Sequence, residues 1–164
     1  MTALSIDELT PWARSPLREV DELPWSRLFE KRAAERPTAT AVVCEDESLS
    51  YHELNERANR MARLLRARGV GAEDVVGLAL PRSPELVVAV LAVLKAGAVF
   101  LPVDLDHPAE RVAYLLDDSG AELILTTTDL AGELPPAAAA VRVDAAATVA
   151  ELSGRSGADL DDAE

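Results

Sequence analysis

The chain has 164 residues and a mass of 17.5 kDa, with 49% hydrophobic and 27% charged residues, which suits one folded domain and excludes a disordered chain. Its formal net charge of −13, from 29 acidic against 16 basic residues, repels phosphate backbones and anionic headgroups and so argues against nucleic-acid and membrane partners. A single cysteine, no secretory signal pattern and no apolar run of bilayer length predict a cytoplasmic protein.

The first part of the chain predicts a linker followed by a helix and a hairpin. Residues 1–22 hold five acidic residues and two prolines with little apolar periodicity, which is typical of a linker or N-terminal arm. A helix is expected over 25–36, because Pro24 suits a helix start and a second proline follows its end. Two short β-branched or polar runs, 40–44 and 48–50, predict the hairpin.

A capping box marks the next helix, expected over 51–68. The Ser50 hydroxyl and the Glu53 carboxylate can satisfy the amides at its start, and Gly69 suits its end. One face of this helix is apolar. The other carries five arginines, which we interpret as a solvated face rather than a partner-binding stripe, since acidic residues accompany them: Arg57, Arg60, Arg63, Arg66 and Arg68.

Strands and helices then alternate. Strands are expected at 75–80, 99–103 and 121–127, and helices at 84–96 and 108–117. The helix over 84–96 is apolar nearly all round and should be deeply buried, with Gly97 closing it in a left-handed conformation. The alternation predicts an α/β fold, a layered parallel or mixed sheet with helices on its faces.

The pattern weakens after Asp129. A short strand over 141–143 and a short helix over 145–152 are expected, and residues 154–164 are predicted to form an acidic, exposed and flexible tail.

Two segments, with their flanks, resemble core motifs of the adenylation domains of nonribosomal peptide synthetases, members of the adenylate-forming superfamily. The first is LSYHEL, and its matching residues are Leu49, Ser50, Tyr51, Glu53 and Leu54. The second is LKAGAVFLPVD, and its matching residues are Leu94, Lys95, Ala96, Gly97, Phe100, Pro102 and Asp104. Val99 and Phe100 are mild departures from the family pattern, which has a small residue and more often tyrosine there.

The resemblance implies that residues 23–153 are part of the N-terminal subdomain of an adenylation domain. The complete enzyme would join an amino acid to AMP with ATP and Mg²⁺, then pass it to a carrier-protein phosphopantetheine thiol. The two motifs belong to the scaffold in that family. No catalytic, cofactor-binding or metal-binding residue of the family is found in this chain, so the chain alone is predicted to be inactive. The pocket residues that select the acid would follow residue 164.

Other candidate residues are assigned mainly to structure. His52 and His107 have no second ligand at metal-binding spacing, and Cys44 is predicted to be a buried, inert thiol. The Ser153–Gly157 stretch lacks the features of a phosphate loop and is expected to be a flexible loop. The acidic groups Asp117–Asp118 and 159–164 are interpreted as solvated surface charge.

Arg82 is the one residue singled out beyond a scaffold role. It follows the 75–80 strand at the end where ligands of open α/β sheets collect. In acyl- and aryl-CoA ligases, which are similar to this family, an arginine near this place can approach the acceptor phosphopantetheine; the plainer alternative is an arginine at a helix start or on the surface.

Two alternatives to the peptide-synthetase scaffold stay open. One is part of an aryl- or acyl-CoA ligase, and the other is a noncatalytic module that complements a separate C-terminal portion. The expected partners are the rest of the adenylation domain, neighbouring synthetase domains and a carrier protein. Exposed apolar surface also predicts self-association.

Overall fold

The computed structural model describes residues 23–135 and 139–161, so the predicted arm over 1–22 lies outside the described residues. In chain order the elements are α2 (Trp25–Glu35), β1 (Thr40–Cys44), β2 (Glu47–Ser50), α3 (Tyr51–Ala67), β3 (Val75–Ala79), α4 (Pro84–Ala96), β4 (Val99–Pro102), α5 (Ala109–Ser119), β5 (Leu123–Thr126), the 3₁₀ helix η1 (Ala131–Glu133), β6 (Ala139–Arg142) and α6 (Ala146–Ser153). The four main predicted helices are confirmed, with boundaries that differ by one or two residues.

A parallel sheet of four strands lies at the centre of the molecule. Its strand order is β4-β3-β5-β6, and each neighbouring pair runs parallel. Val76 of β3 lies opposite Phe100 of β4 on one side and Leu123 of β5 on the other. Every residue of β5 is buried, as expected of a strand covered on both faces. The predicted α/β fold is confirmed.

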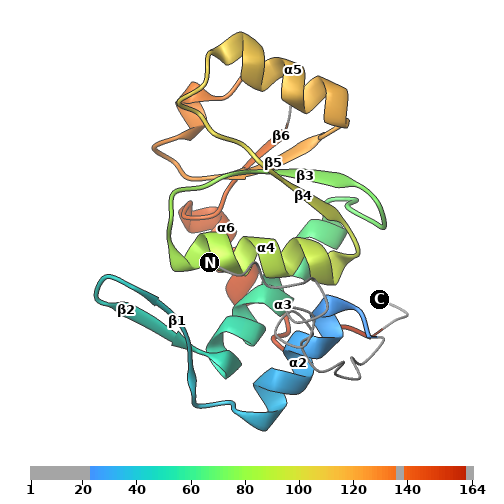
Figure 1. Cartoon of the computed structure of the whole chain (residues 1–164), viewed down its shortest axis with the longest axis vertical. Helices are drawn as coiled ribbons and strands as arrows, with labels where there is room; N and C mark the ends of the chain where they lie inside the picture. The colour runs from blue at the N-terminus through green and yellow to red at the C-terminus, as the bar shows by residue number, and fades with distance from the viewer. Residues whose placement is uncertain (1–22, 136–138, 162–164) are drawn as a thin grey trace, which may run out of the picture.

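Helices cover both faces of the sheet because the chain reverses direction across β3. It passes from β3 through α4 to β4 on one side, then from β4 through α5 to β5 on the other side. Right-handed crossovers in opposite directions place their helices on opposite faces. Figure 1 shows α5 on one face of the sheet and α4 on the other. Accordingly, Ile124 packs with Val112 and Leu116 of α5, while Leu125 belongs to the core on the α4 side.

Helix α4 is covered a second time, by α3, on the side away from the sheet (Figure 1). Leu91 and Val93 of α4 share one buried cluster with Leu54, Leu64 and Leu65 of α3. None of the thirteen residues of α4 is exposed. The predicted deep burial of this helix is therefore confirmed, and its uniformly apolar sequence follows from having neighbours on two sides.

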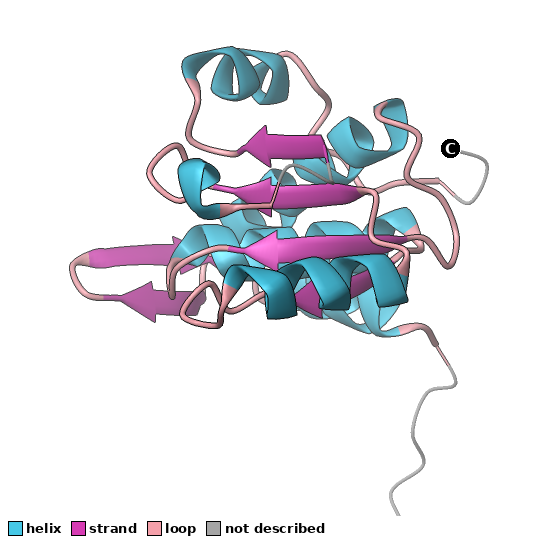
Figure 2. Cartoon of the chain, turned by 90° about the horizontal axis from the view of Figure 1, so that it is seen from above, coloured by secondary structure: helices cyan, strands magenta, loops and turns pink. Residues whose placement is uncertain are grey.

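The hairpin of β1 and β2 stands apart from the parallel sheet, and Figure 2 shows it as a two-stranded projection. Val43 is 70% exposed on it. Cys44, predicted to be buried, is only half-buried, with its Sγ 3.7 Å from the Arg82 carbonyl oxygen. Burial was predicted from the apolar pattern of residues 40–44, whereas this strand lies in a hairpin outside the parallel sheet and none of its residues is fully buried.

Gly97 gives the first test of the fold. It ends α4 with φ of +87°, a conformation that penalises any Cβ, while the nearest atom to an added Cβ is 3.7 Å away. Gly97→Val should therefore destabilise the chain through backbone strain, by about 1–2 kcal/mol. Urea unfolding of Gly97→Val and of Gly132→Val, an exposed glycine with open space around it, measures the difference. Equal stability of the two variants would contradict the assignment.

Candidate functional site

The LSYHEL motif builds the start of α3. The Ser50 hydroxyl accepts a hydrogen bond from the Glu53 amide at 3.3 Å, and the Glu53 carboxylate accepts one from the Ser50 amide at 2.9 Å, which completes the predicted capping box. Hydrogen bonds from the Ser50 hydroxyl and amide lower the pKa of Glu53. Leu49 and Leu54 are buried in the core, and Tyr51 lies beside Phe29 of α2. The motif contacts the core and offers no reactive group.

The LKAGAVFLPVD motif links α4 to the sheet. Its Phe100 and Pro102 lie in β4, the strand at one edge of the sheet, where a proline is tolerated because no ladder partner requires its missing N–H. Asp104 follows the strand, and its Oδ1 accepts a hydrogen bond from the Asp106 amide at 3.0 Å. Its other oxygen lies 3.5 Å from His107 Nδ1. These residues shape the loop after β4.

Lys95, from the same motif, is the buried cation of the molecule's core. Its side chain is 1% exposed, and its Nζ contacts Glu30 Oε1 of α2 and lies 3.8 Å from Asp159 Oδ1. Glu30 also accepts a hydrogen bond from Arg27 at 2.9 Å. The lysine thus joins α2, α4 and the C-terminal segment through charges. A buried charge is retained at such a place only when it is paired.

Side chains of α2 and α3 hold the C-terminal segment by its carbonyl groups. Arg63 donates to the carbonyl oxygens of residues 156, 158 and 159, at 3.0, 2.6 and 3.2 Å. Asn59, which is fully buried, donates to that of residue 157 at 2.8 Å, and Arg27 to that of residue 160 at 3.1 Å. Leu160 is itself buried. Five consecutive carbonyls are therefore bound by side chains of the helices.

Two predictions are corrected in part by this arrangement. Five of the residues 154–161 are exposed, as predicted for a tail, but the segment packs on α3, and its small polar composition concealed the buried Leu160. The arginine face of α3 is only partly solvated: Arg57 and Arg68 are exposed, whereas Arg60, Arg63 and Arg66 are half-buried. Besides Arg63, Arg66 donates to the Lys95 carbonyl at 3.2 Å, and Arg68 pairs with Glu151 at 2.6 Å. Arg63, Arg66 and Arg68 therefore bind groups of the same chain.

Asp159 was predicted to be solvated surface charge; its side chain is 47% exposed, but it also has partners that the sequence did not indicate. Its Oδ1 accepts hydrogen bonds from Asn55 at 2.6 Å and Asn59 at 3.0 Å. Partial burial raises the pKa of Asp159, but the two amide hydrogen bonds and the positive charges of Lys95 and Arg27 outweigh it, so the pKa lies below its usual value. In contrast, Asp117 and Asp118 are exposed on α5 as predicted.

Arg82 lies in the loop after β3, as the sequence predicted, and its side chain is exposed. Its guanidinium makes no hydrogen bond or ion pair with another residue in the described ranges. His52 and His107 are also largely exposed, with one carboxylate near each, at 4.0 Å for Glu56 and 3.5 Å for Asp104. The three residues lie on the surface and do not converge on one site.

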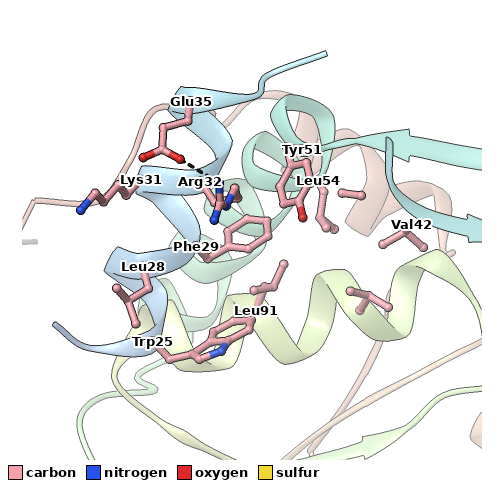
Figure 3. Close-up of a pocket in the computed structure, with 12 residues that line it drawn as sticks. Trp25, Leu28, Phe29, Lys31, Arg32, Glu35, Val42, Tyr51, Leu54 and Leu91 are labelled. Carbon is pink, nitrogen blue, oxygen red and sulfur yellow. Dashed lines mark hydrogen bonds and ion pairs between the residues drawn. The ribbon is translucent and has the colours of Figure 1, made fainter. Parts of the chain in front are cut away.

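An aromatic groove of about 580 Å³ lies between α2, the hairpin and α4 (Figure 3). Trp25 stacks on Phe29 with ring centroids 5.9 Å apart, and Phe29 lies 5.8 Å from Tyr51. Leu54 and Leu91 contribute to its apolar lining. Arg32 and Glu35, which also line the groove, form an ion pair with 2.9 Å between Nη1 and Oε2. The groove presents apolar surface rather than a nucleophile or a pair of carboxylates.

The described residues offer little to hold a nucleotide or its metal. Within 23–135 and 139–161, no three carboxylate, imidazole or thiol side chains gather as a metal site would need. In Ser153–Gly157 the amides of residues 154 and 155 donate to carbonyls of α6, at 3.3 and 3.1 Å. These amides are used within the chain and do not form a phosphate cradle. No helix in the described part of the chain is long and apolar enough to cross a membrane.

Sequence reasoning missed Asn59, which binds the C-terminal segment, and Glu30, which pairs with Lys95 and Arg27 beside it. A signal was present. Glu30 lies three positions before Ala33 on the side of α2 that turns to the core, and Asn59 follows the buried Ala58 on α3. Polar residues on apolar helix faces require buried partners. Lys95, the one basic residue of the largely apolar helix α4, was the matching cation.

A family model described as AMP-binding enzyme matches residues 29–163 of the chain. The dimodular nonribosomal peptide synthase of Bacillus subtilis (strain 168) is 57% identical over 108 residues, which are 66% of this chain and 4% of that protein. Gramicidin S synthase 1 of Brevibacillus brevis is 45% identical over 104 residues, 63% of this chain and 10% of that one. The chain thus spans a small fraction of the length of these relatives.

Solved structures share the fold. The nonribosomal peptide synthetase FmoA3, in an AMPPNP-bound form, superposes with a TM-score of 0.78 at 34% identity, over 88% of this chain and 15% of that chain. The N-terminal subdomain of Klebsiella oxytoca NpsA superposes with a TM-score of 0.71 over 85% of this chain and 34% of that chain. Its identity of 22% makes it a likeness of fold alone.

The buried ion pair gives a test of the core. Lys95→Met should remove the buried cation that contacts Glu30 and leave only the half-buried Arg27 paired with it, at a cost of up to about 3–5 kcal/mol of unfolding free energy. In the double variant Lys95→Met/Glu30→Met the loss should be much smaller, because no buried carboxylate is left without its ammonium partner. Urea unfolding measures both, with Arg82→Met, an exposed residue, as the control expected within about 0.5 kcal/mol of the wild type. A double variant as unstable as Lys95→Met would contradict the pairing.

The lowered pKa of Asp159 predicts a pH-dependent contribution. Because the folded pKa lies below the unfolded value of about 4, the ionised carboxylate stabilises the folded chain above that pH, and the contribution is lost as the pH falls through the folded pKa. The difference in unfolding free energy between the wild type and Asp159→Asn should therefore be larger at pH 7 than at pH 3.5. Asp117→Asn, on the exposed side of α5, is the control. If the difference in unfolding free energy between the wild type and Asp159→Asn were larger at pH 3.5 than at pH 7, the prediction would be refuted.

Proposed function

The chain belongs to the family of AMP-binding enzymes, and we propose that it forms the N-terminal scaffold of an adenylation domain that activates an amino acid as its aminoacyl adenylate for nonribosomal peptide synthesis. The observation that carries this proposal is the agreement with FmoA3 in both sequence and fold over most of the chain. The more similar relatives, whose names describe peptide synthases, support the same class of reaction.

The role proposed for the two motifs is support. LSYHEL fixes the start of α3 through its capping box, and LKAGAVFLPVD places Lys95 in the core and turns the chain into β4. The one imidazole that they carry, His52, is exposed on the surface with a single carboxylate, that of Glu56, 4.0 Å away, and forms no group with a nucleophile. Transfer of an adenylyl group depends on groups that surround the phosphates with positive charge and N–H donors. We therefore assign that chemistry to other parts of the complete domain.

ATP and Mg²⁺ are the proposed cofactors of the complete enzyme, with a carrier-protein phosphopantetheine as the acceptor. The AMPPNP bound to FmoA3 supports ATP, and the artificial NpsA–ThdA fusion, described as an adenylation–PCP di-domain, supports a carrier domain as partner. The proposed partners are the remainder of the adenylation domain, its neighbouring domains and the carrier protein. Arg82 stays a candidate for approach to the acceptor thiol, since it is exposed after β3. Leu23, Trp25 and Val43 are exposed apolar residues through which copies of the chain could associate.

A hybrid enzyme tests the scaffold role. Residues 23–161 of this chain, which include all of α2, would replace the matching segment of the adenylation domain of the Bacillus subtilis dimodular synthase, which is 57% identical over 108 residues. Exchange of pyrophosphate into ATP would then be measured with a panel of amino acids. We expect the hybrid to exchange pyrophosphate with the same amino acid as the unmodified domain, because the two scaffolds share one fold while the pocket comes from the relative.

The controls are this chain alone and the relative's domain with the segment deleted, and both should be inactive. ATP binding by the chain alone should be absent at micromolar concentration in calorimetry. A folded hybrid without exchange would contradict the scaffold role. Pyrophosphate exchange by the chain alone would contradict its assignment as a noncatalytic part.

A further inference from the structure

The path of residues 156–160 is dictated by side chains outside the segment. The segment lies between the end of α6 and residue 161 and forms no strand or helix, yet each of its five carbonyl oxygens accepts a hydrogen bond from Arg27, Asn59 or Arg63. Fixing the backbone of one residue costs about 1–2 kcal/mol of conformational entropy. These hydrogen bonds help to offset the entropy cost of ordering a segment that is mostly small and polar.

Close contact fixes the register of the segment on α3. A Cβ added to Gly157 would lie 2.9 Å from Glu56 Oε1 and 3.2 Å from Arg60 Nη2, so the backbone lies directly against the helix. Leu160 is buried three residues later and closes the far end of the segment. The two contacts exclude a shift of the chain by one residue along the helix.

Charge anchors the same segment to the core. Asp159 faces Lys95, which is buried and contacts Glu30, and Glu30 binds Arg27, which in turn binds the carbonyl of residue 160. The two carboxylates and two cations balance, so the group is neutral as a whole. Because Lys95 is 1% exposed, its position is set by the packing of α4 and not by solvent. The segment is thereby tied to the rigid centre of the molecule.

We propose that Arg27, Asn59, Arg63 and Lys95 form a clamp that fixes the direction in which the chain leaves residue 161. These four residues would thereby position the part of the domain that follows. This inference rests on the proposed function, because only there does the following chain belong to a nucleotide-activating site. In this proposal Lys95 does more than stabilise the core: it links α4 to the segment that ends at residue 161.

Nuclear magnetic resonance of the whole chain tests the clamp directly. Backbone ¹⁵N order parameters of residues 156–161 should be about 0.85 in the wild type and fall below about 0.6 in Arg63→Met, which removes three of the five carbonyl contacts. The order parameters of β3 and α4 should not change. Arg57→Met is the matched control, since Arg57 lies on the same helix and pairs with Glu47 and Glu85 at 3.4 and 3.9 Å, away from the segment. Unchanged order in Arg63→Met would overturn the proposal.

The hybrid enzyme gives the functional readout. Arg63→Met in the hybrid should lower kcat/KM for ATP in pyrophosphate exchange by about 10- to 100-fold, since displacement of about 1 Å at a reacting group can cost that much. Arg57→Met should leave it unchanged. An inactive hybrid without any substitution would contradict the proposed function, whereas an active hybrid that tolerates Arg63→Met would overturn the clamp alone.

Discussion

The structure depends on one constraint, the burial of a helix that is apolar on all sides. Helix α4 can be stable only if it is enclosed, and the sheet and α3 enclose it from opposite directions. This requirement fixes the order of layers in the molecule. The sheet must present one face to α4, α5 must cover the other face, and α3 must lie along the outer surface of α4 (Figure 1). The capping box of α3 and the left-handed Gly97 then define where α3 begins and where α4 ends.

The enclosure of α4 also explains why Lys95 pairs with residues that are distant in the sequence. Lys95 lies in the last turn of the enclosed helix, where its cation must find partners inside the protein. It finds Glu30 from before the first strand and Asp159 from after the last helix. Residues separated by 65 and 64 positions along the chain therefore meet at one nitrogen atom. A motif that contributes no chemistry can still organise the ends of a domain in this way.

The sequence predicted the elements well and the polar contacts poorly, for physical reasons. Helix caps, glycine ends and apolar periodicity act within a few residues, so α3, α4 and the alternating strands could be inferred from local pattern. The contacts of Arg63, Asn59 and Asp159 join positions about 100 residues apart, and no local pattern encodes them. Burial was misjudged where it was inferred from composition: it was missed at Leu160 and overestimated at Cys44. The segment 154–161 contains small and polar residues, yet it is ordered by partners that the sequence does not place beside it.

The open edges of the sheet differ in their capacity to recruit another strand. Within the described residues, β4 and β6 each pair on one side only. The amides of Val99 and Val103 donate inward, toward the β3 side, so the alternate positions of β4, Phe100 and Pro102, face outward. Proline has no N–H to offer, and the β4 edge is therefore a poor template for strand addition. The edge of β6 contains no proline, so growth of the sheet by a further strand is favoured there. The position of Pro102 therefore makes the β6 edge, rather than the β4 edge, the side on which another strand could pair.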